Sequence, residues 1–99
     1  MERLTHQWPV FAEELRAALI AEGEEELAAS ARELEVAERC DCGDDLCQSF
    51  FTGPAPDGQW GPGLRNVWLE PPWPGLLIVD VVDAVIRYVE VVDRPAQLN

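Results

Sequence analysis

The chain of 99 residues contains no lysine, and its seven arginines are set against 19 acidic residues, which gives a formal net charge of −12. The charge is unevenly spread. Residues 1–45 hold 13 acidic residues against four arginines, a net charge of −9, and residues 46–99 hold six against three, a net charge of −3. Proteins that bind DNA or RNA rely on lysine and arginine contacts to phosphates. The shortage of basic residues therefore argues against a nucleic-acid partner.

Long apolar runs are also missing. The first twelve residues include Glu2, His6 and Pro9 and lack the apolar stretch of a signal peptide. Residues 76–92 are mostly apolar, but four charged residues interrupt them, so they cannot span a bilayer. We therefore expect a cytoplasmic protein without membrane contact, in which thiols stay reduced. The length fits a single small domain, residues 1–99.

Histidine is scarce, and this limits the catalytic sites that the chain can build. His6 is the only histidine, and it precedes the first expected helix, whereas a hydrolytic triad needs a histidine oriented by a carboxylate. The glycines of residues 58–63 are mixed with proline and lack the lysine of a phosphate-binding loop. We assign no catalytic residue and predict a non-catalytic protein.

The first third of the chain has the apolar spacing of helices. Pro9 suits a first helical turn, and apolar residues then recur at intervals of three and four. Gly23 interrupts the pattern, and three glutamates follow it, which favours the start of a second helix. We predict a helical hairpin over residues 9–22 and 24–34. A single helix bent at Gly23 is the alternative.

The period changes to two after residue 34, which indicates strands. We expect a strand running into Cys40, a turn, a returning strand over residues 47–52, a third strand at 67–69 and two last strands at 76–81 and 85–92. Residues from 94 onwards should fray. The predicted fold is α+β: an N-terminal helical hairpin (about residues 9–34) packed on one face of an antiparallel meander of four or five strands (about residues 35–93).

The pattern of the last two expected strands predicts an irregularity in the sheet. Val79, Val81, Ile86, Val89 and Val91 are expected to face the core. Ile86 and Val89 lie an odd number of residues apart, so both can face the core only if a β-bulge falls between them.

All three cysteines, Cys40, Cys42 and Cys47, lie within eight residues. Tetrahedral zinc sites use four cysteine or histidine ligands, usually paired two to four residues apart on a turn. Cys40 and Cys42 would point to one face of a strand, with Cys47 across the turn. The fourth ligand would be His6 or a local carboxylate among Asp41, Asp44 and Asp45.

Two alternatives to zinc stay open, and we favour the first. The three thiols stay reduced and have a structural role in the hairpin, or Cys42 and Cys47 form a disulfide in oxidised protein. Zinc is the one cofactor that the sequence suggests. A catalytic thiol is disfavoured, because the neighbouring aspartates oppose thiolate formation.

Two sets of residues suggest contact with another protein. Trp60 and Trp73 lie in loops rich in proline and glycine, and tryptophan is a frequent anchor at interfaces. Trp60 could instead cap the sheet, and we interpret Trp8 and Trp68 as core residues. The second set consists of acidic residues of the expected helices: Glu13, Glu14, Glu24 and Glu25.

The C-terminal strands and the cysteine hairpin resemble segments of small uncharacterised bacterial domains. The matching residues are Val79-Asp80-Val81, Ile86 and Val89-Glu90-Val91-Val92-Asp93. The Cys-x-Cys-Gly hairpin, followed by Ser49-Phe50, resembles hypothetical proteins of actinobacteria. The resemblance implies a fold of this kind and no activity. Ala84 stands where those domains have a turn glycine.

The leading functional hypothesis from the sequence is a non-catalytic module that binds a basic protein partner, because an acidic field speeds encounter with such a partner. The alternative is a small zinc- or thiol-dependent protein that uses Cys40, Cys42 and Cys47, with residues 52–66 as a lid.

Overall fold

The computed structural model of the protein describes residues 2–56, 58 and 60–99. Its elements, in chain order, are β1 (Glu2–Arg3), α1 (Leu4–Gln7), α2 (Pro9–Ala21), α3 (Glu25–Ser30), the 3-10 helix η1 (Ala31–Glu33), β2 (Glu35–Val36), β3 (Glu38–Arg39), β4 (Phe50–Phe51), β5 (Leu64–Leu69), β6 (Leu76–Val82) and β7 (Val85–Val92).

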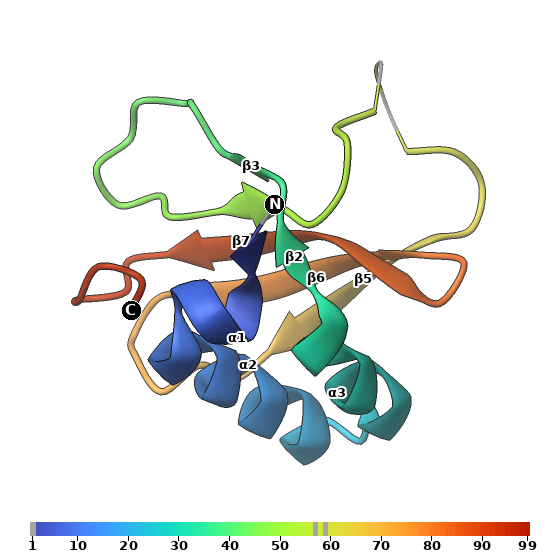
Figure 1. Ribbon diagram of the computed structural model, residues 1–99, viewed down its shortest axis with the longest axis horizontal. Coiled ribbons are helices and arrows are strands. Elements are labelled where there is room, and N and C mark those ends of the chain that lie inside the picture. Colours follow the sequence, from blue (N-terminus) through green and yellow to red (C-terminus); the bar gives the residue numbers. More distant parts are fainter. Residues whose placement is uncertain (1, 57, 59) are drawn as a thin grey trace.

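These elements confirm the α+β class. Among the described residues, the structure has three α-helices, one five-stranded antiparallel sheet and one two-stranded sheet. Figure 1 shows the helices together on one side of the larger sheet. The strand order β3-β4-β7-β6-β5 departs from the expected meander, because β4 pairs with β7 and not with β5. β4 is the second strand from one edge of the sheet, and β5 forms the opposite edge.

Local sequence features account for the bounds of α2 and α3. Pro9 is the first residue of α2, where the missing N–H leaves no hydrogen bond unmade. Gly23 has a φ of +81°, a left-handed conformation that glycine adopts without strain, and it separates α2 from α3. The second helix is shorter than expected, since α3 ends at Ser30 and the chain continues as a 3-10 turn.

One apolar core lies between the helices and the sheet. Phe11, Leu15 and Leu19 of α2 recur at intervals of four and are fully buried. Buried residues of the sheet belong to the same cluster, and along β6 they alternate as the pleat requires. The fully buried members from the sheet are Phe50, Leu77, Val79, Val81, Ile86, Val89 and Val91.

The expected β-bulge is confirmed. Asp80 pairs with Tyr88 and Val81 pairs with Ile86, so Arg87 is an extra residue on β7. Ile86 and Val89 are consequently both buried. Thr52 fixes the bulge from the neighbouring strand: its N–H donates to the carbonyl of Arg87 (3.0 Å) and its hydroxyl donates to the carbonyl of Ile86 (2.6 Å).

The expectation that the C-terminal residues fray was wrong. Arg94 and Leu98 are both buried, with 8% of each exposed. The Gln48 side chain holds the segment, because its amide N–H donates to the carbonyls of Arg94 and Ala96 while its carbonyl accepts from the N–H of Leu98. The N–H of Phe11 donates to the carbonyl of Asn99 (2.8 Å). The tail therefore belongs to the packed structure.

The N-terminal arm is also ordered, which the sequence did not predict. Leu4 of α1 is fully buried, and its N–H donates to the carbonyl of Leu34 (2.8 Å). β1, which precedes α1, pairs antiparallel with β2, which follows η1. Within the described residues, the structure contains no helix with the length and apolarity needed to cross a membrane.

Candidate metal centre

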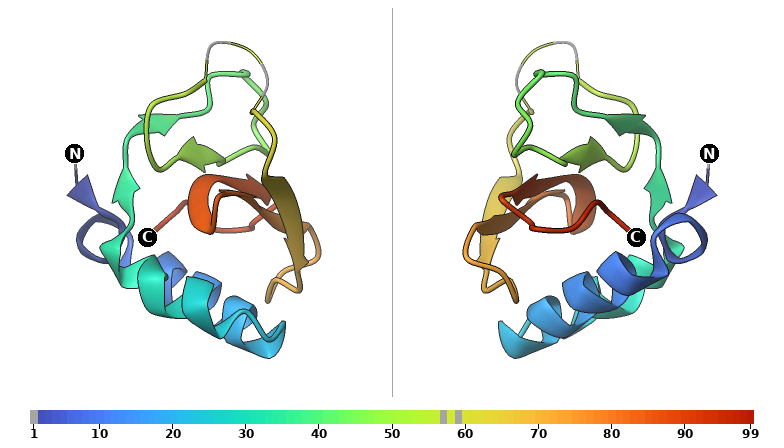
Figure 2. Two further views of the ribbon diagram at one scale, coloured as in Figure 1. Left: turned by 90° about the vertical axis from the view of Figure 1, so that its right-hand side faces the viewer. Right: turned by 90° about the vertical axis from the view of Figure 1, so that its left-hand side faces the viewer.

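The three cysteines lie on the loop between β3 and β4, which we call the cysteine loop (residues 40–47). The N–H of Cys40 donates to the carbonyl of Ser49 (2.9 Å), and Cys47 forms an antiparallel bridge with Val92 of β7. Both ends of the loop are therefore fixed to the sheet. Figure 2 shows the loop extending on the side of the sheet away from the helices.

A tight turn brings the cysteines at the two ends of the loop together. Gly43 has a φ of +79°, and Asp44 stabilises the turn that follows. The Asp44 carboxylate accepts the N–H of Leu46 (2.8 Å), and its carbonyl accepts the N–H of Cys47 (3.1 Å). This is the side-chain turn chemistry for which aspartate is favoured.

The sulfur atoms of Cys40, Cys42 and Cys47 all lie within 4.8 Å of one another, and all three thiols are free. Sulfur ligands on one zinc ion lie about 3.8 Å apart, given a Zn–S distance of about 2.3 Å and tetrahedral angles. Cys42 is exposed, so a change of its rotamer can close the difference. The loop thus presents three soft donor atoms to one point.

The thiols differ in acidity. Partial burial raises the pKa of the Cys47 thiol, but the Ser49 hydroxyl and N–H, together with the other two thiols, outweigh burial and lower this pKa below its usual value. The N–H of Asp44 lowers the pKa of the Cys42 thiol, but Cys40 and Cys47 outweigh it, so this pKa is raised. Cys47 therefore ionises before Cys42.

Two polar side chains flank the sulfur atoms. The Ser49 hydroxyl is buried and lies 3.3 Å from the Cys47 sulfur, and it accepts the N–H of Val91 (2.9 Å). Tyr88 lies on the neighbouring strand. Burial, assisted by the charge of Cys40, raises the pKa of Tyr88 to about 12, so its hydroxyl keeps its proton at neutral pH. The Cys47 thiol donates to the Ser49 hydroxyl, which donates in turn to the carbonyl of Val91 (3.5 Å).

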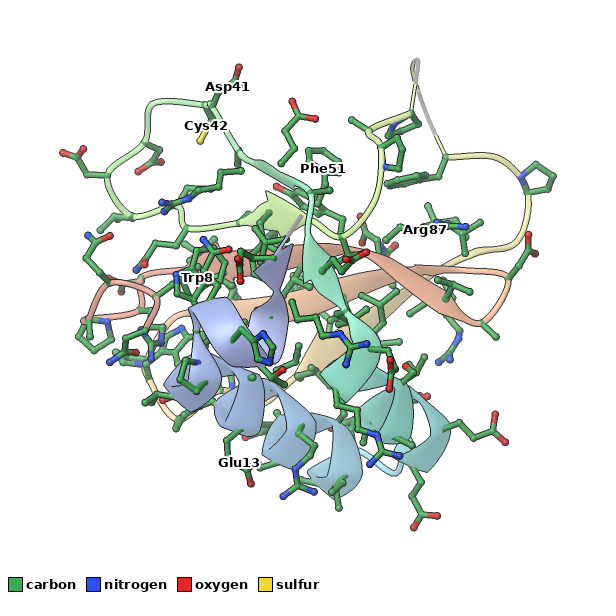
Figure 3. The ribbon with its side chains drawn as sticks, in the orientation of Figure 1. Trp8, Glu13, Asp41, Cys42, Phe51 and Arg87 are labelled. Atoms are coloured by element: carbon green, nitrogen blue, oxygen red, sulfur yellow. The ribbon has the colours of Figure 1, made fainter. Side chains whose placement is uncertain are left out.

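The other expected ligands do not join the three sulfurs. His6 lies in α1, is exposed, and is not a member of the group of ligand atoms within 4.8 Å. Asp41, Asp44 and Asp45 are exposed and also lie outside that group. Figure 3 shows the Asp41 carboxylate pointing away from the molecule, while the Cys42 sulfur points back toward it. The described residues supply three donors.

The four glutamates expected to face a partner have different surroundings. Glu13 pairs with Arg16, Glu24 with Arg65, and Glu14 with the buried Arg94. Glu25 forms no ion pair with any described arginine and is exposed at the start of α3. Arginines within the chain thus neutralise three of the four carboxylates, which weakens the field expected from the helices.

The tryptophans also occupy places that the sequence only partly predicted. Trp8 is a core residue, as expected. Trp73 is buried as well, with 7% exposed, and its indole N–H donates to the carbonyl of Val92 (3.0 Å), so it offers almost no surface to a partner. Trp60 is half-buried, with its ring 6.5 Å from that of Phe51. The assignment of Trp68 to the core was wrong, because 63% of it is exposed.

Comparison with protein-family models, with curated proteins and with solved structures found no match.

Ser49 and Tyr88 are the site residues that sequence reasoning missed. Ser49 follows Cys47 by two positions, so alternation along the strand expected at residues 47–52 could have indicated that the two side chains share a face. Tyr88 reaches the site because β4 pairs with β7, in the register Phe51 to Tyr88. Nothing in the local sequence encodes that pairing.

Proposed function

We propose that the protein binds a soft metal ion through the thiolates of Cys40, Cys42 and Cys47. The observation that carries the proposal is the convergence of three sulfur atoms within 4.8 Å of one another on a loop fixed at both ends to the sheet. A preformed set of donors lowers the entropy that ordering would cost on binding.

Zinc is the ion that we propose first. Thiolate ligands select zinc, copper(I) or iron–sulfur clusters over hard cations. Three thiolates carry a charge of −3, and three aspartates stand in the same loop. A divalent cation offsets this charge better than a monovalent one, which favours zinc over copper(I). A reducing compartment such as the cytoplasm suits this role, because thiols persist there.

Metal analysis of protein purified without chelator tests the proposal. We expect one zinc ion per chain, and loss of the ion on replacing any one of the three cysteines by serine. Asp45→Asn is the matched control, because it changes an exposed residue of the same loop that lies outside the sulfur group. Purified protein that takes up no zinc, cobalt or copper(I) under reducing conditions would refute the proposal.

A second candidate function is the binding of a basic protein partner by the acidic helices. It is favoured by the exposed carboxylates at the junction of α2 and α3, namely Glu22, Glu25 and Glu26, which form no ion pair with a described arginine. Its test is capture of a basic partner that is lost near 0.5 M salt, where the Debye length is about 4 Å. Capture that persists after Glu22, Glu25 and Glu26 are changed to glutamine would exclude this surface.

A further inference from the structure

We infer that the metal ion bound at the cysteine loop keeps one coordination position open, and that this position takes a neutral imidazole from a histidine on a basic protein segment. The inference rests on the proposed function, since it concerns the same three sulfur ligands.

The open position follows from the number of donors. Zinc in proteins is usually four-coordinate, and sites with three protein ligands hold water or a substrate at the fourth position. No His, Asp or Glu among the described residues joins the three sulfurs. The site is also accessible, because Cys42 is exposed and 55% of Leu46 is exposed.

Charge selects the chemistry of the incoming ligand. Zinc with three thiolates keeps a net charge of −1, and the same eight-residue loop carries the exposed carboxylates of Asp41, Asp44 and Asp45. This negative charge makes an added thiolate or carboxylate less favourable than a neutral ligand. Imidazole is neutral and is a good zinc ligand. A second copy of this chain is disfavoured as the source, because it also carries a net charge of −12.

The same charges favour a basic segment around that histidine. No described arginine forms an ion pair with Asp41, Asp44 or Asp45. The arginine nearest in sequence, Arg39, has its guanidinium 5.5 Å from the centre of the Trp8 ring and so is engaged on the helical side. The rim of the site therefore carries an uncompensated negative field, which attracts lysine and arginine.

Cobalt(II) serves as the probe, because its visible absorption bands respond to each ligand. The full chain is loaded with one equivalent of cobalt and titrated with imidazole and with three peptides: a basic peptide with one histidine, the same peptide with that histidine replaced by alanine, and an acidic peptide with one histidine. Imidazole and both histidine peptides should shift the bands. The basic one should bind about tenfold more tightly than the acidic one, within the range of surface-field effects. The alanine peptide should leave the bands unchanged.

Two sets of variants test whether the aspartates of the cysteine loop cause the preference for the basic peptide. Asp41→Asn, Asp44→Asn and Asp45→Asn together should abolish the preference for the basic peptide. Cobalt should still bind through the three sulfurs, with an affinity lowered by the loss of three negative charges. The amide that replaces the Asp44 carboxylate keeps an oxygen to accept the N–H of Leu46. The matched control removes three exposed charges elsewhere, through Glu22→Gln, Glu25→Gln and Glu26→Gln, and should keep the preference. Equal affinity for the basic and acidic peptides, or the same loss of preference in both variants, would overturn the charge argument.

The outcomes separate this inference from the proposed function. Stoichiometric cobalt binding whose bands ignore imidazole and every peptide would overturn the open position alone. A change of those bands on His6→Ala would then identify a closed site with His6 as its fourth ligand. Absence of cobalt binding would refute the proposed function itself.

Discussion

Cys47 and Cys42 lie in one cluster, yet the pKa values of their thiols are shifted in opposite directions. The pKa of Cys47 is lowered by the Ser49 hydrogen bonds and by the other two thiols, despite partial burial. The pKa of Cys42 is raised, because the neighbouring sulfurs outweigh the N–H of Asp44. A metal ion requires deprotonated thiols, so protons compete with it at both positions. Of these two thiols, Cys42 is the later to lose its proton.

We therefore expect the metal affinity to fall as the pH falls, and to keep rising with pH above the range of an ordinary thiol until Cys42 is ionised. The ultraviolet absorbance of thiolate, followed against pH in the metal-free protein, should show separate steps. Cys47→Ser should remove a step below the usual thiol range, and Cys42→Ser a step above it. A single titration at the usual thiol pKa would contradict the assignment.

Glu14 and Glu13 are adjacent in sequence, yet their ion pairs differ in burial. Glu14 pairs with Arg94, whose side chain is 4% exposed, whereas both side chains of the Glu13–Arg16 pair are at least 46% exposed. Breaking a buried ion pair costs about 3–5 kcal/mol. Because Glu14 itself is 26% exposed, we expect Glu14→Gln to lower the free energy of unfolding by about 2 kcal/mol. Glu13→Gln should leave it nearly unchanged, because an ion pair on the surface contributes little to stability.

Urea unfolding of the two variants provides the measurement, because the two sites differ by one residue in sequence and the substitution is the same. Equal effects would show that Arg94 is held by its other contacts, which are its hydrogen bonds to the carbonyls of Ala96 and Gln97 and to the side chain of Asn99.

The turn between β6 and β7 is the element in which a residue type conflicts with its backbone. Asp83 and Ala84 have φ values of +51° and +67°, the left-handed conformations of a two-residue hairpin turn. Aspartate tolerates this region, but alanine does so at a cost of about 1 kcal/mol. Glycine avoids that cost, although it adds entropy to the unfolded chain.

We expect Ala84→Gly to raise the free energy of unfolding by about 0.5 kcal/mol, as the left-handed cost exceeds the entropic one. The control is Ala29→Gly at an exposed position of α3, which should lower the free energy of unfolding by about 1 kcal/mol. Thermal unfolding of both variants shows whether each substitution stabilises or destabilises the protein. A destabilising Ala84→Gly would mean that the entropy of the unfolded chain dominates at this turn.

Elements with a strong local signal were predictable. Residues 85–92 form β7 over the bounds expected from alternation, and α2 ends one residue from its expected end. The bulge at Arg87 followed from parity alone. The assignment of Trp68 to the core was wrong, because alternation along β5 puts Trp68 on the opposite face from Val67 and Leu69, which are buried. Non-local pairing was out of reach, above all that of β4 with β7.

The candidate site likewise has features that the sequence predicted and features that it did not. The spacing of Cys40, Cys42 and Cys47 predicted that the three thiols lie close together, although β3 ends at Arg39, so Cys40 and Cys42 lie on a loop and not on the expected strand. The ion pairs that neutralise the helical glutamates could not be predicted. Arg65 lies 41 residues from Glu24, and Arg94 lies 80 residues from Glu14. Contacts at such separations depend on the finished fold, which short sequence patterns do not encode.

Across the whole molecule, the core and the cysteine loop are separate structures. The buried cluster runs from Leu4 to Leu98 and contains none of the three cysteines. Phe50 is the buried residue of β4 that ties this part of the chain to the core. A chain of this length buries enough surface to fold without a metal. The metal is therefore expected to add to a fold that exists without it.

We expect the metal-free protein, and the variant with Cys40, Cys42 and Cys47 all changed to serine, to keep the far- and near-ultraviolet circular dichroism of the zinc-bound protein. Zinc at 100 times its dissociation constant should add about 2.7 kcal/mol of stability, and each kcal/mol raises the melting temperature of such a domain by about 4–8 °C. The triple serine variant should show no such rise, because it lacks the ligands. Unfolding of the protein by a chelator alone would mean instead that the cysteine loop holds the sheet together, as the metal does in zinc fingers.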